Sequence, residues 1–160
     1  MKIHKEVIEI IELDKNELNE IDSKLLEEAK IASENAYAPY SNFKVGASLL
    51  LENDEIYTAN NQENAAYPSG LCAERIAIYA AKSNYPKNKI LKIAVYMNTE
   101  TGKNTMILPC GSCRQSISEY EFNQDTNIEI ITQKKNSNIF KSNSIKNILP
   151  NSFNSSDLIG

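Results

Sequence analysis

The stretch SGLCAERIAIYAA, residues 69–81, decides the fold because it combines a helix start with two reactive side chains. Its first residues are typical of a loop, and the following Ala and Ile residues are typical of a helix, so the stretch predicts a helix over residues 71–83. Cys72 and Glu74 then lie at the junction of loop and helix. A thiol and a carboxylate side by side at a helix start need a chemical explanation.

The elements on both sides of this helix predict an α/β fold. The tail beyond residue 133 is rich in Asn, Ser and Lys and is predicted to wrap over the domain. The first predicted elements are a helix from Ser23 that Pro39 ends and a hairpin over 43–62 with the polar turn ENDE. The helix over 71–83 follows, and then an apolar strand over 89–98. After residue 98 we expect a turn leading to a short strand or loop, a helix over 111–121 and a strand over 127–132. We expect a three-layer α/β/α sandwich with a mixed sheet of about five strands and the cysteine-bearing helices on one face.

Length and composition indicate one globular domain and exclude several classes of protein. The chain has 160 residues, of which 41% are hydrophobic and 24% charged. Its net charge of −4 argues against a partner made of nucleic acid or anionic membrane, which basic clusters usually bind. No segment has the pattern of a signal peptide or a membrane span, so we expect a cytoplasmic protein.

Three cysteines indicate a metal site. Cys110 and Cys113 form PCGSC at the start of a predicted helix, and Cys72 opens the earlier one. Free N–H groups and the helix dipole favour thiolates at such positions, and thiolates are zinc ligands. Three protein ligands leave a fourth position for water, as in catalytic zinc sites, whereas the only histidine, His4, lies far away in sequence. A redox CxxC pair and a Cys72 buried for packing are the alternatives.

Glu74 supplies what a purely structural zinc site does not need. It could carry protons to and from a metal-activated water, which is general acid/base catalysis. The alternative is a solvated acid that stabilises the first helical turn. The neighbouring metal-site pattern favours catalysis.

Together these motifs resemble the zinc-dependent cytidine deaminases, in their small homotetrameric form that acts on free nucleosides. The resemblance covers roughly residues 23–158 and rests on five ordered blocks: AYAPYSNFKVGASLL, NNQENAAYP, LCAERIAIYAA, PCGSCRQ and LPNSFNSSDL. It implies a cytidine deaminase-like domain over residues 23–160 after an N-terminal extension of residues 1–22, which the shortest family members lack. It also implies one Zn²⁺ per subunit and a homotetramer whose subunits share active sites.

The resemblance also implies roles for individual residues. Cys72, Cys110 and Cys113 match the zinc ligands, Glu74 the proton shuttle, and Arg75 a donor to the thiolates. Asn61 and Glu63 match positions that bind the ribose, a role that suits their amide and carboxylate. The remaining positions matched to the substrate site are Phe43, Ala66, Tyr67, Ala73 and Phe153, the last supplied by a neighbouring subunit.

Some of these residues also have simpler interpretations. Phe43 could belong to the core, Arg75 could form a surface salt bridge, and the polar loop around Asn61 could lack a ligand. No role follows for Arg114 and Gln115 beyond hydrogen bonding at a helix start.

The predicted activity is hydrolytic deamination of cytidine and 2′-deoxycytidine to uridine and 2′-deoxyuridine, with release of ammonia, in pyrimidine salvage. One alternative is deamination of another free cytosine nucleoside such as blasticidin S, although the pair of ribose-binding positions favours plain nucleosides. The other is a zinc or thiol module without catalysis, which would leave Glu74 unexplained.

Overall fold

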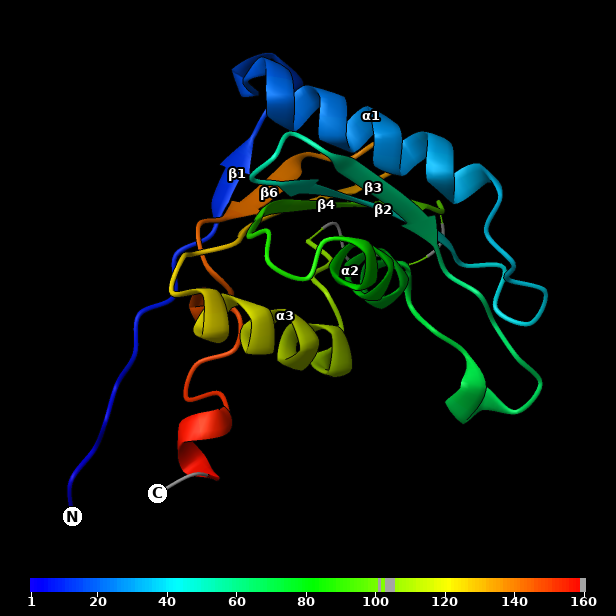
Figure 1. The fold of residues 1–160 in the computed structure, drawn as a ribbon. Helices are drawn as coiled ribbons and strands as arrows, with labels where there is room; N and C mark the ends of the chain where they lie inside the picture. Colours follow the sequence, from blue (N-terminus) through cyan, green and yellow to red (C-terminus); the bar gives the residue numbers. More distant parts are fainter. Residues whose placement is uncertain (101, 103–105, 159–160) are drawn as a thin grey trace.

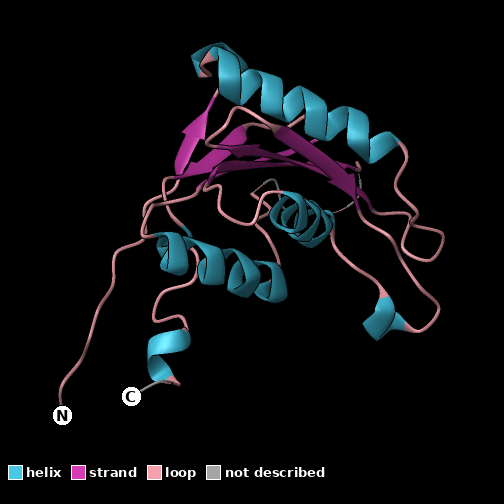
Figure 2. Cartoon of the chain, viewed as in Figure 1, coloured by secondary structure: helices cyan, strands magenta, loops and turns pink. Residues whose placement is uncertain are grey.

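A mixed sheet lies between one helix on one face and two helices on the other (Figures 1 and 2). The computed structural model describes residues 1–100, 102 and 106–158. The helices are α1 (Glu20–Glu34), α2 (Ala73–Asn84) and α3 (Gly111–Gln124). The strands are β1 (Ile11–Leu13), β2 (Lys44–Leu51), β3 (Ile56–Asn60), β4 (Ile90–Asn98), β5 (Glu129–Lys134) and β6 (Ile139–Ser142). The predicted α/β/α sandwich is confirmed.

The sheet has six strands in the order β1-β6-β5-β4-β2-β3, whereas about five were expected. Residues 139–142, in the segment predicted to be an irregular tail, form β6 and pair antiparallel with β5. The N-terminal extension contributes β1, which pairs antiparallel with β6. The extension is therefore part of the sheet, and its boundary at residue 23 stays a prediction.

The strand β4 lies at the centre of two cores, one on each face of the sheet. Side chains alternate across a strand, so Ile93 and Val95 contact the core beneath α2 and α3, while Ala94 contacts the core beneath α1. The prediction that the apolar run over 89–98 is covered on both faces is confirmed.

The helix α1 begins earlier than predicted and packs unusually close to the sheet. Its N-cap is Asn19, whose side chain accepts a hydrogen bond from Asp22 N, and not Ser23, because helix continues on both sides of Ser23. A Cβ atom at Gly46 of β2 would lie 1.9 Å from Ala29 O of α1. Only glycine permits this approach of helix backbone to strand.

The strand directions bring the starts of α2 and α3 together. The strand β2 pairs antiparallel with both β3 and β4, and β4 pairs parallel with β5, so β3, β4 and β5 point the same way. The connections from β3 to β4 and from β4 to β5 contain α2 and α3 respectively. Both helices therefore follow carboxyl ends of strands at one edge of the sheet, where ligand sites of α/β proteins form.

Residues 101 and 103–105, in the turn predicted after residue 98, lie outside the described residues. Among the residues that are described, none of the helices combines the length and the apolar character needed to cross a membrane.

Candidate active site

Three cysteine sulfurs converge where α2 and α3 begin. Cys72 is the N-cap residue of α2, Cys110 is the N-cap residue of α3, and Cys113 lies in the first turn of α3. The Sγ atoms of Cys72 and Cys110 are 3.9 Å apart, and those of Cys110 and Cys113 are 3.5 Å apart. The predicted placement of all three thiols at helix N-termini is therefore confirmed.

These sulfurs fit a zinc ion. Zinc–sulfur bonds of about 2.3 Å in a tetrahedron place two sulfurs about 3.8 Å apart, close to both measured distances. All three Sγ atoms lie within 4.8 Å of one another, and all three cysteines are free of disulfides. The donor set is therefore that of one Zn²⁺ per chain held by three protein ligands.

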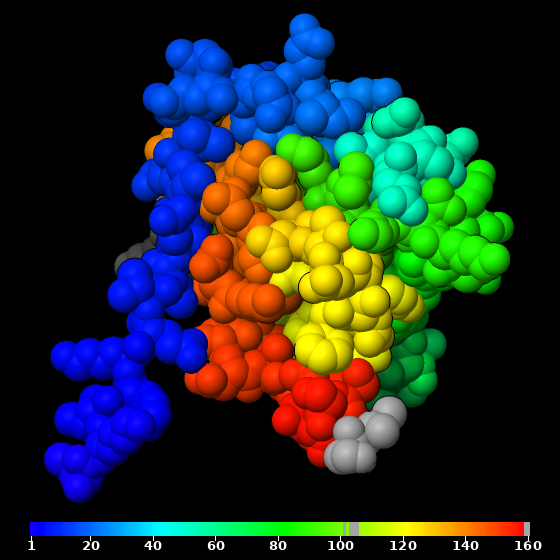
Figure 3. All heavy atoms as spheres, turned by 60° about the vertical axis from the view of Figure 1, so that its left-hand side comes forward, coloured from blue at the N-terminus to red at the C-terminus, as the bar shows by residue number. Residues whose placement is uncertain are grey.

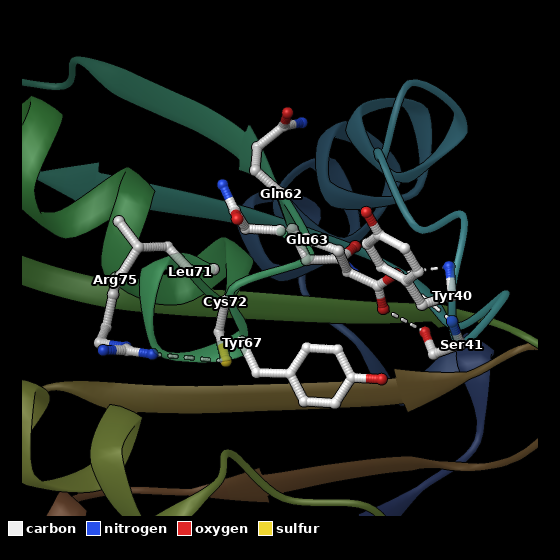
Figure 4. Close-up of a pocket in the computed structure, with 11 residues that line it drawn as sticks. Tyr40, Ser41, Gln62, Glu63, Tyr67, Leu71, Cys72 and Arg75 are labelled. Atoms are coloured by element: carbon white, nitrogen blue, oxygen red, sulfur yellow. Dashed lines mark hydrogen bonds between the residues drawn. The ribbon is translucent and has the colours of Figure 1, made fainter.

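The surroundings of the sulfurs favour negative charge. The pKa of the Cys72 thiol is lowered to about 5, mainly by a hydrogen bond with Cys113 and also by the Arg75 guanidinium, which outweigh the effect of burial. The Nη2 atom of Arg75 lies 3.9 Å from Cys72 Sγ (Figure 4). A cation at this place stabilises thiolate ligands, as the resemblance implied for Arg75.

Glu74 lies in the first turn of α2 and is buried beside the cysteines. Only 5% of the residue is exposed. Removal from water raises the pKa of its carboxyl group to about 7, against the usual 4.5. Glu74 also lines the same cavity as Cys72 and Cys110. It is therefore not the solvated acid that the simpler interpretation required.

This cavity has a volume of about 370 Å³, which is within the range of small-molecule sites. Cys72, Cys110 and Glu74 line it, and so do the polar residues Ser41, Asn61 and Glu63. Its apolar walls come from loops and strands: Phe43, Val45, Val95, Met97, Ile107, Leu108 and Pro109. The cavity thus combines reactive, polar and apolar groups.

A second cavity of about 450 Å³ shares residues with the first and extends past Arg75 and Tyr67 (Figure 4). Tyr67 is 76% exposed, and its ring lies 6.3 Å from that of Tyr40. The predicted substrate loop therefore borders this outer cavity.

The two polar residues matched to the ribose site also order the loop that precedes β2. The side chain of Asn61 accepts a hydrogen bond from Val45 N and donates one to Phe43 O. The carboxylate of Glu63 accepts hydrogen bonds from Tyr40 N and from the Ser41 hydroxyl. The bond from Ser41 is the main reason why the pKa of Glu63 is lowered.

The remaining predicted substrate residues differ in whether they line a cavity. Phe43 lines the cavity and also packs against the main core, so its core interpretation is confirmed and its contact with substrate stays a prediction. Ala73 is fully buried at the start of α2. Ala66 lines neither cavity, and its N–H and C=O groups bond to Asn64 and Ser69.

Phe153 lines neither of the two cavities of its own chain. It is 56% exposed, in the C-terminal segment. Its predicted contact with substrate therefore needs a second chain and stays a prediction.

The sequence interpretation assigned no specific role to two residues of the site, Ser41 and Arg114. Ser41 received no role, although it holds Glu63, because a serine in a polar loop carries no pattern of its own. Arg114 lies next to Cys113 and donates to the carbonyl groups of Pro109 and Ile148. Its position directly after a ligand was the only signal.

Three sulfur donors and a buried carboxyl group where two helices begin, with Cys72, Cys110 and Glu74 lining one cavity, are the groups of a zinc-dependent hydrolase. Comparison with known proteins gives the family. Residues 19–126 match the model of the "cytidine and deoxycytidylate deaminase zinc-binding region". The chain belongs to this family and is a deaminase.

Individual relatives agree with this assignment. The chain is 45% identical over 97 residues to a cytidine deaminase of Sporosarcina psychrophila, covering 61% of this chain and 68% of the relative. It is 36% identical to a cytidine deaminase of Mycoplasma genitalium over 132 residues, covering 82% and 95%. A crystal structure of cytidine deaminase from Burkholderia pseudomallei superposes with a TM-score of 0.69 at 35% identity, covering 81% of this chain and 97% of that one.

Proposed function

We propose that this protein hydrolyses cytidine and 2′-deoxycytidine to uridine and 2′-deoxyuridine and releases ammonia. The observation that carries the proposal is that Cys72 and Cys110 of the sulfur cluster line one cavity together with the buried Glu74 carboxyl group. A structural zinc module does not need a buried acid facing a cavity of substrate size. The family and its cytidine deaminase members support the same reaction.

In the reaction a bond from water oxygen to C4 of the base forms, and the bond from C4 to the amino nitrogen breaks. Cys72, Cys110 and Cys113 would hold the Zn²⁺, which would supply the Lewis acidity that makes the attacking water nucleophilic. Glu74 accepts a proton from the attacking water and passes it to N3 of the base. It then takes the second proton from the hydroxyl group now on C4 and delivers it to the amino group, which leaves as ammonia. Its burial keeps bulk water from competing for these protons.

Polar side chains orient the nucleoside in the cavity. The Glu63 carboxylate retains one lone pair beyond the three hydrogen bonds from Tyr40 and Ser41, and the amide of Asn61 retains one N–H beyond the bond to Phe43 O. These groups would bind the ribose hydroxyls. The ring of Phe43 would then pack against the base.

The other residues matched by resemblance have supporting roles in this proposal. Arg75 stabilises the thiolates, Tyr67 covers the substrate at the outer cavity, and the main chain of Ala66 and Ala73 binds the polar edge of the base. The placement of Arg75 beside Cys72 and the exposure of Tyr67 support their parts.

We also propose a cytoplasmic homotetramer with active sites shared between subunits. The exposure of Phe153, which lines neither cavity of its own chain, supports active sites shared between subunits. The three cysteines form no disulfide, which supports a cytoplasmic location. Residues 23–160 form the catalytic domain, and residues 1–22 are an extension that the chemistry does not need. Sedimentation equilibrium measures the number of subunits.

The test is ammonia release from cytidine, 2′-deoxycytidine and blasticidin S, with and without a zinc chelator. Plain nucleosides should react and blasticidin S should not. In the variant Glu74→Gln, kcat should fall by about 10²–10⁴-fold while zinc content stays unchanged, because only the proton carrier is lost. Chelator-insensitive turnover, or a Gln variant with normal turnover, would contradict the mechanism.

A further inference from the structure

The C-terminal segment (148–153) is hydrogen-bonded to one turn of α3. Figure 3 shows the C-terminal residues, in red, lying against α3, in yellow. Three hydrogen bonds join them: Arg114 Nη1 donates to Ile148 O at 2.8 Å, Gln115 Nε2 donates to Phe153 O at 2.8 Å, and the hydroxyls of Ser118 and Ser152 lie 3.0 Å apart. The bonds reach both ends of the segment, so its path along the helix is defined.

Arg114 makes a second contact that leads to the metal site. Its Nε atom donates to Pro109 O at 2.6 Å. Pro109 is buried, lines the cavity and directly precedes Cys110. One guanidinium therefore joins the carbonyl of the C-terminal segment to the carbonyl before a zinc ligand. Because a guanidinium is planar and its donors have a fixed geometry, the two carbonyls are held at a set separation.

The end of the segment that Arg114 contacts is itself fixed. Ile148 is only 5% exposed and belongs to the main core. Just before it, Ile145 N and the Ser144 hydroxyl donate to the buried carboxylate of Glu121, which also lies on α3. Arg114 is therefore held against a rigid support and not against a loose tail.

We propose that Arg114 is a positioning residue that holds Pro109, and through it Cys110, in the geometry that binds the metal. Gln115 and Ser118 assist by fixing the far end of the C-terminal segment. The activity test of this inference rests on the proposed function, whereas the test of metal retention does not. The inference gives a role to Arg114 and Gln115, for which the sequence indicated only hydrogen bonding at a helix start.

The first test is the rate at which a chelator removes zinc from the loaded protein, measured far below the melting temperature of each variant. Arg114→Met should release zinc about 10–100-fold faster than the unchanged protein, the usual effect of losing a contact that orients a ligand. In Arg114→Lys the side chain can donate to only one of the two carbonyls at a time. Its rate of zinc release should therefore lie between those of the unchanged protein and Arg114→Met. Lys146→Met is the matched control, since it removes a positive charge from an exposed side chain near the same segment.

The second test separates positioning from general stability. Gln115→Met should speed zinc release less than Arg114→Met. In the double variant its additional effect should shrink, because both changes free the same segment. Unchanged zinc release in Arg114→Met, or a control that releases zinc equally fast, would overturn the proposal. If Arg114→Met does not fold, Arg114→Lys and Gln115→Met decide by the same criterion.

Activity distinguishes this inference from the proposed function. If the unchanged protein releases no ammonia from cytidine, the proposed function fails, and zinc retention still tests the role of Arg114. If the unchanged protein is active, kcat of Arg114→Met at saturating zinc should fall by about 10-fold or more. A normal kcat together with normal zinc retention would show that Arg114 positions nothing.

Discussion

Replacing Asp22 by Asn should destabilise the protein far more than removing an exposed ion pair. The Asp22 carboxylate, whose side chain is 2% exposed, lies 2.7 Å from Lys92 Nζ and 2.9 Å from Lys141 Nζ. Breaking a buried pair costs about 3–5 kcal/mol. Glu129 stays within 2.8 Å of both ammonium groups, so we expect the lower end, about 3 kcal/mol. For a chain of this length that lowers Tm by about 6–12 °C.

The assay is thermal unfolding with Glu100→Gln as the matched control. Glu100 and Lys135 form a pair of similar length, 2.9 Å, but their side chains are 68% and 40% exposed. An exposed pair contributes about 0–1 kcal/mol, so the control should lower Tm by no more than a few degrees. Equal losses in the two variants would refute the reasoning, because burial would then make no difference.

The effect of Asp22 should also depend on pH in a definite direction. Burial alone would raise the pKa of Asp22, but hydrogen bonds and charges from Lys92 and Lys141 outweigh it and lower the pKa below its ordinary 3.8. A lowered folded-state pKa means that the stabilisation is complete above about pH 4 and is lost as pH falls through the folded value. The gap in Tm between the protein and Asp22→Asn should therefore narrow below pH 4.

Three further predictions concern the metal, the packing of α1 and the N-terminus. Cys110→Ala should reduce zinc from one ion per chain to nearly none by atomic absorption, because two sulfurs hold the ion too weakly; full occupancy would remove Cys110 from the ligand set. Gly46→Ala should lower the free energy of unfolding, measured in urea, by about 1–3 kcal/mol, because the new Cβ would overlap Ala29 O. An unchanged urea midpoint would mean that α1 shifts freely. Deleting residues 1–10 should leave kcat within about twofold, since none of them lines a described cavity, and a larger loss would give the extension a part in catalysis.

The helices and the central strand could be predicted because their signals are local. The apolar run over 89–98 and the change from loop residues to Ala and Ile residues within 69–81 belong to single elements, and both match the structure closely. The convergence of the three cysteines was predictable because each sulfur lies at a helix start, and helices that follow parallel strands begin at one edge of a sheet.

The two outer strands could not be predicted, because tertiary pairing decides them. The segment over 139–142 has only two apolar residues, followed by Lys and Ser and flanked by Asn, and it becomes a strand by pairing with β5. The same holds for residues 11–13, which become a strand only beside β6. The ion cluster of Asp22 joins residues up to 119 positions apart, a separation that carries no pattern in sequence.

The candidate site divides in the same way. The three cysteines and Glu74 could be predicted from their motifs and their positions at helix starts. The residues that hold the site in place could not. Ser41 and Arg114 act through bonds to Glu63 and to two backbone carbonyls, which only a folded chain brings within reach. The contacts assigned to Ala66 and Phe153 stay predictions.

The pairing of β1 with β6 has a practical consequence for handling the protein. Without residues 11–13 the backbone of β6 would form an open sheet edge that other chains could extend, and exposed edges of this kind promote aggregation. The side chain of Asn138, just before β6, also donates to Glu12. Shortened forms made for crystallisation should therefore start before Ile11, and solubility should drop sharply once a truncation passes Leu13.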